Sequence, residues 1–256
     1  MTTAATIYRI HAPIPEFLVR EKDNLIEAKI YDEAGVITAP ASGTVTLYNA
    51  SNTKIVDAAA VSINSDTGVS SYTILAASLP ESESYGDGWR LEWDLVFGAD
   101  PAVKFVRAAS LVRSNLFPTV IATDLEARHQ NLSRLIATGN DADDFITAAW
   151  EVLLRMLLKA GRMPYLILSP FALHDALVFK SLELIFRDGH TAAGDGKYAE
   201  LAEDYQNMFA TEWASISFDY DSSQDGQADA DEKAGAEAVI YTGGPGVQTG
   251  SLRRWP

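Results

Sequence analysis

The chain has 256 residues, of which 47% are hydrophobic and 21% are charged. This composition is typical of a globular protein and argues against a disordered, collagen-like or coiled-coil chain. The 35 acidic and 20 basic residues give a net charge of −15, which repels nucleic-acid phosphates and anionic lipids and so argues against a protein that grips DNA.

The sequence also limits where the protein can work. Cysteine is absent, which excludes disulfides, thiolate metal sites and a cysteine nucleophile. Residues 1–15 lack the basic and apolar segments of a secretion signal, and no stretch reaches the ~18 apolar residues of a membrane span. We therefore expect a soluble protein, made in a reducing cytoplasm, with no membrane contact.

From Asn24 to Arg113, apolar and polar residues alternate in short runs separated by turn-forming residues. Such runs indicate β-strands with one buried face. Six or seven strands with a turn every ~8–12 residues are typical of a β-sandwich, and we predict an immunoglobulin-like domain over residues 1–116. The expected strands are Leu25–Tyr31, Gly43–Tyr48, Ile55–Ile63, Gly68–Leu75, Trp89–Phe97 and Val103–Val112.

From Thr123 the apolar spacing becomes helical. We predict a short helix at residues 124–128, with Thr123 or Asp124 as its N-cap. A longer helix is expected over residues 142–160, capped by Asp141 and stopped by Gly161. Its predicted apolar stripe consists of Phe145, Ala149, Val152, Leu153 and Met156.

The next predicted helix begins at Ser169-Pro170 and ends at Gly189, since Ser is a good N-cap, Pro suits the first helical position and Gly suits a helix end. Its apolar residues go almost all the way around the helix. A helix of this kind must be buried on more than one side. Within a unit of roughly a hundred residues, the second side is hard to supply, so we expect a neighbouring subunit to cover it.

A last amphipathic helix is expected over residues 197–216, and a Gly- and Pro-rich extended tail over residues 242–256. The predicted fold is therefore α+β with two domains, a β-sandwich (1–116) followed by a helical bundle (117–241) and the tail. The residues expected to face inward from the last helix are Tyr198, Leu201, Tyr205, Met208, Phe209 and Trp213.

No constellation typical of an enzyme is present in the sequence. The four histidines stand apart, without metal-ligand spacing, and the chain has no Gly-x-Ser-x-Gly motif. The residues 189–197 lack the Gly-Lys-Ser/Thr ending of a phosphate-binding loop. We therefore expect a protein without catalytic residues and without a required cofactor.

An acidic segment after the last helix has the oxygen spacing of an EF-hand calcium loop, with Gly226 at the sixth position, where such a loop turns sharply. Ala228 at the eighth position departs from that pattern, and no clear helix follows. The alternatives are a structural calcium site and a solvated acidic turn. The candidate ligands are Asp221, Ser223, Asp225, the Gln227 carbonyl, Asp229 and Glu232.

The extreme C-terminus is a candidate partner-binding segment, formed by Leu252, Arg253, Arg254 and Trp255. Trp255 suits an apolar pocket, and the two arginines suit carboxylates of a partner. The competing interpretation is a disordered terminus, because most chain ends are disordered.

The helical half resembles the head-to-tail connector (adaptor) proteins of tailed bacteriophages. The resemblance covers roughly residues 123–233 and lies in an ordered series of segments: Asp124 to Arg128, a long helix ending near Gly161-Arg162-Met163-Pro164, Ser169-Pro170 opening an apolar helix, and Lys197 to Tyr205 leading to a last helix and an acidic stretch. The N-terminal β-domain departs from the short members of that family.

The resemblance implies a structural virion protein that forms a homo-oligomeric, twelve-fold ring below the portal protein. It further implies contacts with tail-side connector or terminator proteins, a C-terminal segment that reaches the portal, and a channel through which DNA passes without specific binding. An acidic channel wall agrees with such passage. Such a protein is assembled in the bacterial host cytoplasm and resides in the virion.

The alternative is a carbohydrate- or surface-binding β-sandwich that the helices multimerise. Trp89 and Trp93 would then form an exposed platform. Their alternation places both on one face with Leu91, which favours the core instead.

Overall fold

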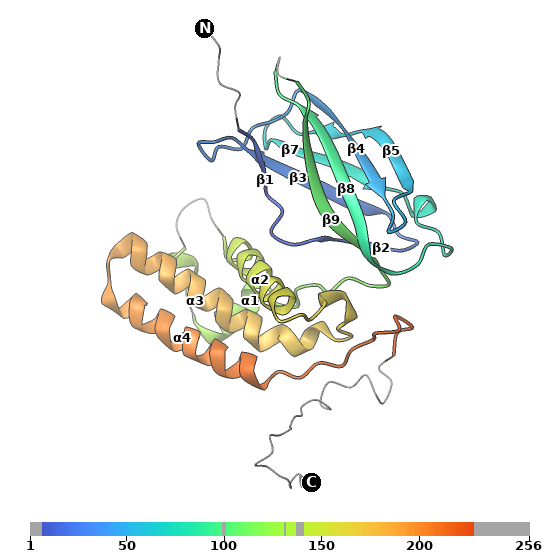
Figure 1. Cartoon of the computed structure of the whole chain (residues 1–256). Coiled ribbons are helices and arrows are strands. Elements are labelled where there is room, and N and C mark those ends of the chain that lie inside the picture. The colour runs from blue at the N-terminus through green and yellow to red at the C-terminus, as the bar shows by residue number, and fades with distance from the viewer. Residues whose placement is uncertain (1–6, 99–100, 131, 137–140, 228–256) are drawn as a thin grey trace, which may run out of the picture. The chain divides into compact units, whose positions relative to one another are not determined.

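The computed structural model describes residues 7–98, 101–130, 132–136 and 141–227. It contains an N-terminal β region followed by helices, which confirms the α+β class (Figure 1). The chain divides into two compact units, Met1–Asn115 and Leu116–Pro256. We call them the β unit and the helical unit.

The described strands of the β unit form two sheets. Their orders are β1-β3-β7-β6 and β2-β9-β8-β4-β5. Neighbouring strands run antiparallel except β2 and β9, which are parallel. The strands are β1 (Arg9–Ile10), β2 (Glu16–Val19), β3 (Asn24–Tyr31), β4 (Ser42–Tyr48), β5 (Lys54–Ala60), β6 (Ser62–Ile63), β7 (Val69–Ile74), β8 (Gly86–Val96) and β9 (Val103–Val112).

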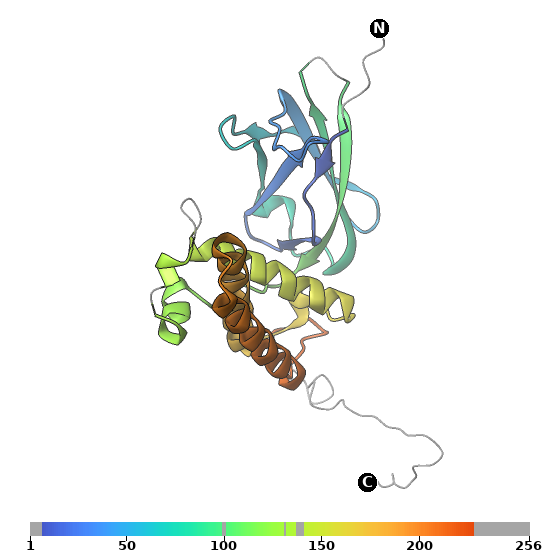
Figure 2. The same cartoon turned by 90° about the vertical axis from the view of Figure 1, so that its left-hand side faces the viewer.

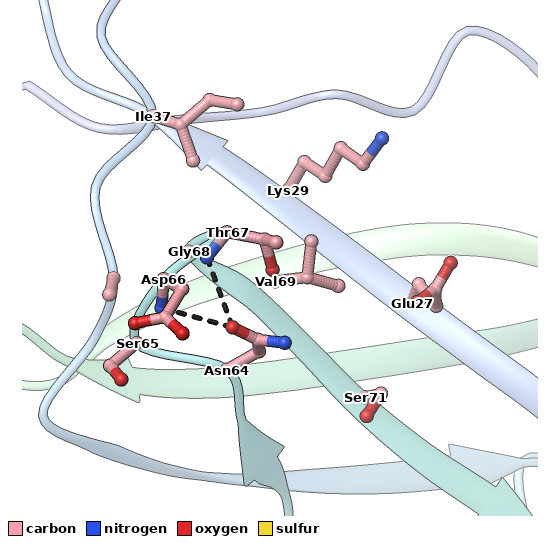
Figure 3. A pocket seen from close by; sticks show the side chains of 11 residues that line it. Glu27, Lys29, Ile37, Asn64, Ser65, Asp66, Thr67, Gly68, Val69 and Ser71 are labelled. Carbon is pink, nitrogen blue, oxygen red and sulfur yellow. Dashed lines mark hydrogen bonds between the residues drawn. The ribbon is translucent and has the colours of Figure 1, made fainter.

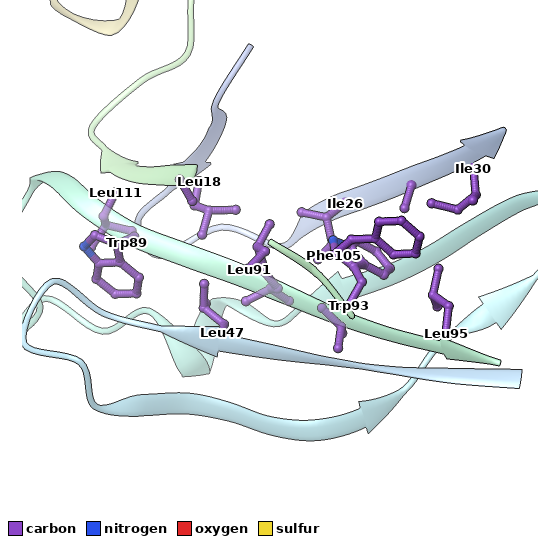
Figure 4. Close-up of a cluster of buried hydrophobic side chains, with 14 of the residues drawn as sticks. Leu18, Ile26, Ile30, Leu47, Trp89, Leu91, Trp93, Leu95, Phe105 and Leu111 are labelled. Atoms are coloured by element: carbon purple, nitrogen blue, oxygen red, sulfur yellow. The ribbon is translucent and has the colours of Figure 1, made fainter. Parts of the chain in front are cut away.

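One hydrophobic core joins the two sheets (Figure 4). Ile26 and Ile30 enter it from β3, while Leu91 and Trp93 enter it from β8. The side chains alternate because successive residues of a strand point to opposite faces. Trp89 is only 3% exposed and Trp93 is fully buried. Both tryptophans therefore belong to the core, and the exposed aromatic platform of the alternative interpretation does not form.

The prediction of the strands is incomplete at two places. The short strands β1 and β2 were not predicted, because Pro13 and Pro15 interrupt the alternation near them. The expected strand Ile55–Ile63 is two strands, β5 and β6, that belong to different sheets. The chain changes sheet at Val61, whose N–H donates to the Gly43 carbonyl.

The described elements of the helical unit are four α-helices and three short 3-10 turns. The first helix and the 3-10 turn that follows it precede residues 137–140, which the structure does not describe. The elements are α1 (Ala122–Arg128), η2 (Leu132–Arg134), α2 (Ala142–Lys159), η3 (Pro164–Leu166), η4 (Pro170–Leu173), α3 (His174–Ala193) and α4 (Gly196–Ser215).

The predicted start of α2 is confirmed and that of α1 is not. The carboxylate of Asp141 accepts hydrogen bonds from the N–H groups of Asp143 and Asp144. In α1, Asp124 lies inside the helix, and its carboxylate accepts from the N–H of Ile121. Either way an acid satisfies free N–H groups at a helix start. The buried stripe of α2 also differs from the prediction and consists of Ile146, Ala149, Leu153, Leu154 and Leu157.

Two glycines have different roles in the α3–α4 hairpin. Gly189 does not end α3 as predicted, but is buried within it. A Cβ added to Gly189 would lie 3.8 Å from the Tyr198 ring, an ordinary contact distance, so the packing of α4 does not require a glycine there. Gly194 ends α3 with a positive φ of 68°, which glycine adopts without strain. Asp195 then caps α4 by accepting from the Lys197 N–H.

The expectation that α3 needs a neighbouring subunit is wrong. Leu177, Leu182 and Phe186 on α3 are buried within a single chain. The helix packs against α1 and α2 and lies side by side with α4 (Figure 1). The quarter turn of Figure 2 brings the α3–α4 connection to the front. The apolar pattern correctly predicts that α3 is buried on more than one side. The helices that cover these sides belong to the same chain.

Candidate functional site

The predicted C-terminal site, Leu252, Arg253, Arg254 and Trp255, lies outside the described residues. The structure does fix the point from which the chain approaches it. After α4 the backbone pairs with the η3 region, where Ile167 forms a bridge with Tyr220. The Leu168 N–H donates to the Asp219 carbonyl at 3.1 Å. These bonds fasten the strand-like residues 219–221 to the helical unit.

The acidic loop begins directly at this bridge. Asp221 is only 5% exposed. One carboxylate oxygen accepts the Asp225 N–H at 2.9 Å, and the other accepts the Gly226 N–H at 2.7 Å. The carboxylate of Asp225 accepts the Gln227 N–H at 2.9 Å. The loop is therefore closed by its own carboxylates.

The loop backbone turns where the calcium-loop register requires it. Gln224 and Gly226 have positive φ values of 56° and 100°. Asp229 and Glu232, which would complete the ligand set, lie outside the described residues. The described residues contain no group of three or more His, Asp or Glu side chains that could hold a metal. The structural calcium site stays a prediction.

The four histidines make contacts that belong to packing or to helix ends. His174 Nδ1 is 3.2 Å from the Thr119 hydroxyl, and His190 Nδ1 is 3.0 Å from the Asp195 carbonyl. His129 packs edge-on against the Phe186 ring. His11 lies near the Tyr31 ring in the β unit. In these contacts each histidine has a different partner, and no two histidines contact each other.

A charged cluster around the buried Glu183, which was not expected from the sequence, lies on α3. Glu183 is 1% exposed, and its carboxylate binds Lys180 and Arg187, each at 2.7 Å. Lys180 also lies 5.2 Å from the centre of the Phe209 ring of α4. The spacing of three and four residues along one helix could have indicated these pairs. Their burial could not be read from the sequence, because it depends on where α4 packs.

The helical unit exposes several large apolar side chains. Phe171 in η4 is 70% exposed, and Phe117, Ile121, Leu168 and Met208 are also exposed. Single exposed apolar residues are ordinary, whereas two phenylalanines and an isoleucine on a small unit offer contact area to a partner.

The β unit has a pocket of about 730 Å³ on its four-stranded sheet (Figure 3). Lys29 and Glu27 of β3 lie on one side, and the residues 64–68 between β6 and β7 close the other. Within that turn, the Asn64 side-chain oxygen accepts the N–H groups of Asp66 and Thr67. None of the eleven lining residues is aromatic. The pocket therefore offers charges and hydroxyls but no ring on which a sugar could stack.

Comparison with known proteins gives little information on this chain. No protein-family model matches it, and no curated protein matches it. Among solved structures it is similar to one described as "Crystal structure of the Lin-41 filamin domain", at 12% identity, over 42% of this chain and 93% of that chain, with a TM-score of 0.26. A TM-score this low carries no argument about fold or function. Within the described residues, no helix is long and apolar enough to span a membrane.

Proposed function

We propose that the protein is a structural virion protein, a head-to-tail connector adaptor of a tailed bacteriophage. Copies of the chain assemble as a twelve-fold ring below the portal protein and contact tail-side connector or terminator proteins. The N-terminal part is an immunoglobulin-like β-sandwich domain and the helical unit is the adaptor domain. The resemblance of residues 123–233 to that family carries the proposal.

The order of elements in the helical unit supports this proposal. A short helix, a long helix, an apolar helix and a last helix follow one another, and the chain then returns as an extended segment beside η3. Pro170 opens the 3-10 turn η4, and the apolar helix α3 begins after it at His174 and not at Ser169-Pro170 as predicted. Exposed Phe171 and Ile121 provide apolar area for contacts between copies. Because α3 is covered within one chain, a single copy can be stable before the ring forms.

The charge of the chain supports a channel role. With a net charge of −15, a ring of such subunits provides few cations for phosphates. DNA can then slide through the ring without specific binding.

The proposal is tested by measuring mass with purified portal rings. The chain alone is expected to be a monomer, and the mixture is expected to contain twelve copies per portal ring. Removal of residues 250–256 is expected to leave a folded protein that no longer joins portal-containing heads. If the truncated protein joins portal-containing heads normally, residues 250–256 do not make the proposed portal contact. Absence of any complex between the full chain and portals would overturn the adaptor proposal.

A matched pair of variants separates ring contacts from general surface effects. Phe171→Asp changes an exposed apolar residue of the helical unit, and Val106→Asp changes one of the β unit. We expect the first variant to lose incorporation into the ring and the second to retain it. Both positions are exposed, so neither change should unfold the chain. Equal incorporation of the two variants would contradict a ring built through this part of the helical unit.

The second candidate is a β unit that binds a surface partner, and the pocket of Figure 3 supports it. The missing aromatic platform argues against a glycan that stacks on tryptophan. The test is a binding screen on glycan and host-surface arrays with the full chain. Binding that is lost in Lys29→Glu and retained in Lys104→Glu, a β9 lysine outside the pocket, would favour this candidate over the adaptor.

A further inference from the structure

A groove between α3 and α4 is lined by one face of α4 and by one aromatic residue of α3. Its volume is about 440 Å³. From α4 the groove takes residues spaced three, four, seven and eight positions apart, which is one helical face. The lining residues are Phe179, Asp204, Asn207, Met208, Thr211 and Glu212.

The apolar part of the groove consists of Phe179 and Met208. Met208 is 48% exposed, although its spacing along the helix predicted an inward-facing side chain. Phe179 is half-buried and packs against the Tyr205 ring, with 6.5 Å between the ring centres. Met208 is therefore the more accessible apolar side chain of the groove, and Phe179 borders it while also contacting Tyr205 and Arg128. A thioether beside an aromatic ring suits another aromatic ring.

The rim of the groove is negative. Asp204 is exposed and Glu212 is partly exposed, and the described residues give neither carboxylate an ion pair. The cations on this side of the unit already have acidic partners. Arg128 binds Asp175 at 2.9 Å while its guanidinium lies 5.4 Å from the centre of the Phe179 ring, and Arg187 binds Glu183 at 2.7 Å. Over its whole length, α4 contains four acids and one lysine. The groove therefore fits a ligand with an aromatic group and cations.

We propose that this groove binds the C-terminal segment of its own chain, residues 252–256. Trp255 occupies the apolar hollow over Met208 and Phe179, and the two arginines lie against Asp204 and Glu212. Arg253 and Arg254 are the only charged residues between Ala238 and Pro256, so this segment is a cationic end on a strongly anionic chain. Guanidinium–carboxylate pairs around a buried indole are a strong recognition pattern.

The length of the chain permits this contact within one copy. Trp255 follows the last described residue, Gln227, by 28 positions, which span up to about 90 Å when extended. A random coil of 28 residues has a root-mean-square span of about 30 Å, and α4 is itself about 30 Å long. A tether that matches the required span gives an effective concentration in the millimolar range. The contact therefore forms within one molecule before it forms between two.

The proposal concerns the isolated chain and does not depend on a portal. It implies that the segment which we propose to meet the portal is held on α4 until that partner competes for it. Failure of portal binding and failure of this contact can be told apart, because the test below contains only this protein.

The test uses the four methionines and the absence of cysteine. The full chain is labelled with ¹³C in its methionine methyl groups, and Met208→Leu assigns the Met208 signal. Ser251→Cys provides a single site for a nitroxide spin label. We expect paramagnetic broadening of the Met208 methyl to exceed that of the Met156 methyl at least fivefold. Equal broadening of the two methyls would overturn the proposal.

Matched charge variants test the recognition. Asp204→Lys/Glu212→Lys is expected to remove the selective broadening of Met208. Glu200→Lys/Glu203→Lys makes the same change of charge on α4 outside the groove and is expected to retain it. Trp255→Ala is expected to remove the broadening while leaving the circular dichroism spectrum unchanged. If both pairs of lysine substitutions remove the broadening equally, the C-terminal segment is attracted to negative charge anywhere on α4. That result would overturn binding in the groove.

A mixing experiment tests whether the contact is made within one molecule. Spin-labelled protein without ¹³C is mixed at 50 µM, roughly twentyfold below an effective concentration of about 1 mM, with ¹³C-labelled protein that has no spin label. We expect no broadening of Met208 in the mixture. Broadening equal to that of the doubly labelled chain would show that the segment binds a second copy, and would overturn the intramolecular contact.

Discussion

The helical unit buries Glu183 and the β unit partly buries Glu16, but the two units compensate the charge differently. In the helical unit, Glu183 lies between two cations of its own helix, Lys180 and Arg187. In the β unit, Glu16 of β2 pairs with Arg107 of β9, a residue distant in sequence. A buried charge is tolerated only with a partner. The helix can supply that partner locally, whereas the sheet has to bring it from another strand.

The Glu183 cluster of the helical unit and the Glu16–Arg107 pair of the β unit therefore have different roles. The Glu183 cluster fixes how α4 packs on α3, because Lys180 also contacts the Phe209 ring. Arg107 fixes the N-terminal segment of the β unit. Its side chain donates hydrogen bonds to the Ile14 carbonyl and to the Glu27 carbonyl besides pairing with Glu16. The arginine therefore ties β2 and β3 to β9 by polar contacts, in addition to the buried Phe17 and Leu18 of β2.

The largest expected effect is that of Glu183→Ala. The variant leaves Lys180 partly buried without its anion, and breaking a buried pair in this way costs about 3–5 kcal/mol of the free energy of unfolding. Urea denaturation followed by circular dichroism measures the loss. Glu203→Ala removes an exposed acid of α4 and should cost less than about 0.5 kcal/mol.

A second variant of this cluster tests the reason for the loss. Lys180→Met/Glu183→Leu replaces both charges by apolar side chains, and we expect it to be more stable than Glu183→Ala. If the double variant is equally unstable, the cluster contributes through packing and not through its charges.

The next largest effect is expected for Arg107→Met in the β unit, with a loss of about 2–4 kcal/mol at pH 7. Burial already raises the pKa of Glu16 above 4.5, and Arg107 opposes that rise. Because the pKa is raised, the contribution of Glu16 to stability is fully present below pH 4.5 and is lost as the pH rises through its value in the folded protein. Without Arg107 the pKa rises further, so the loss should be larger at pH 7 than at pH 4.

Urea midpoints of Arg107→Met and the wild type, measured between pH 4 and pH 7, provide the check. Arg113→Met changes an arginine at the end of the β unit and serves as the control, with a smaller loss expected. A difference between wild type and Arg107→Met that stays constant with pH would contradict the role of Glu16.

The two units also differ in how much of them could be predicted from the sequence. Alternation locates the main strands of the β unit because each has one buried face, and it places Trp89 and Trp93 in the core. The same rule fails for β2, whose residues Phe17 and Leu18 are both buried and adjacent. It also misses the change of sheet at Val61, because a strand that crosses between two sheets keeps its alternation.

In the helical unit, caps could be predicted and contacts could not. Asp141 is recognisable because its carboxylate acts on residues two and three positions ahead. The end of α3 is not, because Gly189 and Gly194 look alike in the sequence, whereas only Gly194 has the positive φ of a helix end. The exposure of Met208 depends on how α4 lies on α3. The groove could therefore not be found from the apolar pattern.

A smaller effect is expected at the acidic loop of the helical unit. Asp221→Ala leaves the N–H groups of Asp225 and Gly226 without their acceptor, and we expect a loss of about 1–2 kcal/mol. Thermal unfolding with and without 1 mM CaCl₂ separates the two interpretations of the loop. A calcium-dependent rise of the midpoint in the wild type, absent in Asp221→Ala and with MgCl₂, would support the structural site. A wild type that does not respond to calcium would limit Asp221 to closing the loop.

The smallest expected effect lies on the surface of the β unit and has the opposite pH dependence to that of Glu16. Glu92 receives hydrogen bonds from Lys104 at 2.7 Å and from Arg90 at 3.1 Å, and these bonds lower its pKa below 4.5. A lowered pKa means that the contribution of Glu92 to stability is present above pH 4.5 and is lost as the pH falls through the pKa of Glu92 in the folded protein.

Glu92→Gln should therefore cost stability at pH 7 and little at pH 3. Because both cations are partly exposed, the cost is expected to be below about 1 kcal/mol and to shrink in 0.5 M NaCl. Parallel urea titrations at the two pH values measure it, with Glu81→Gln as an exposed control. A larger cost at pH 3 than at pH 7 would contradict the opposite signs that we assign to Glu16 and Glu92.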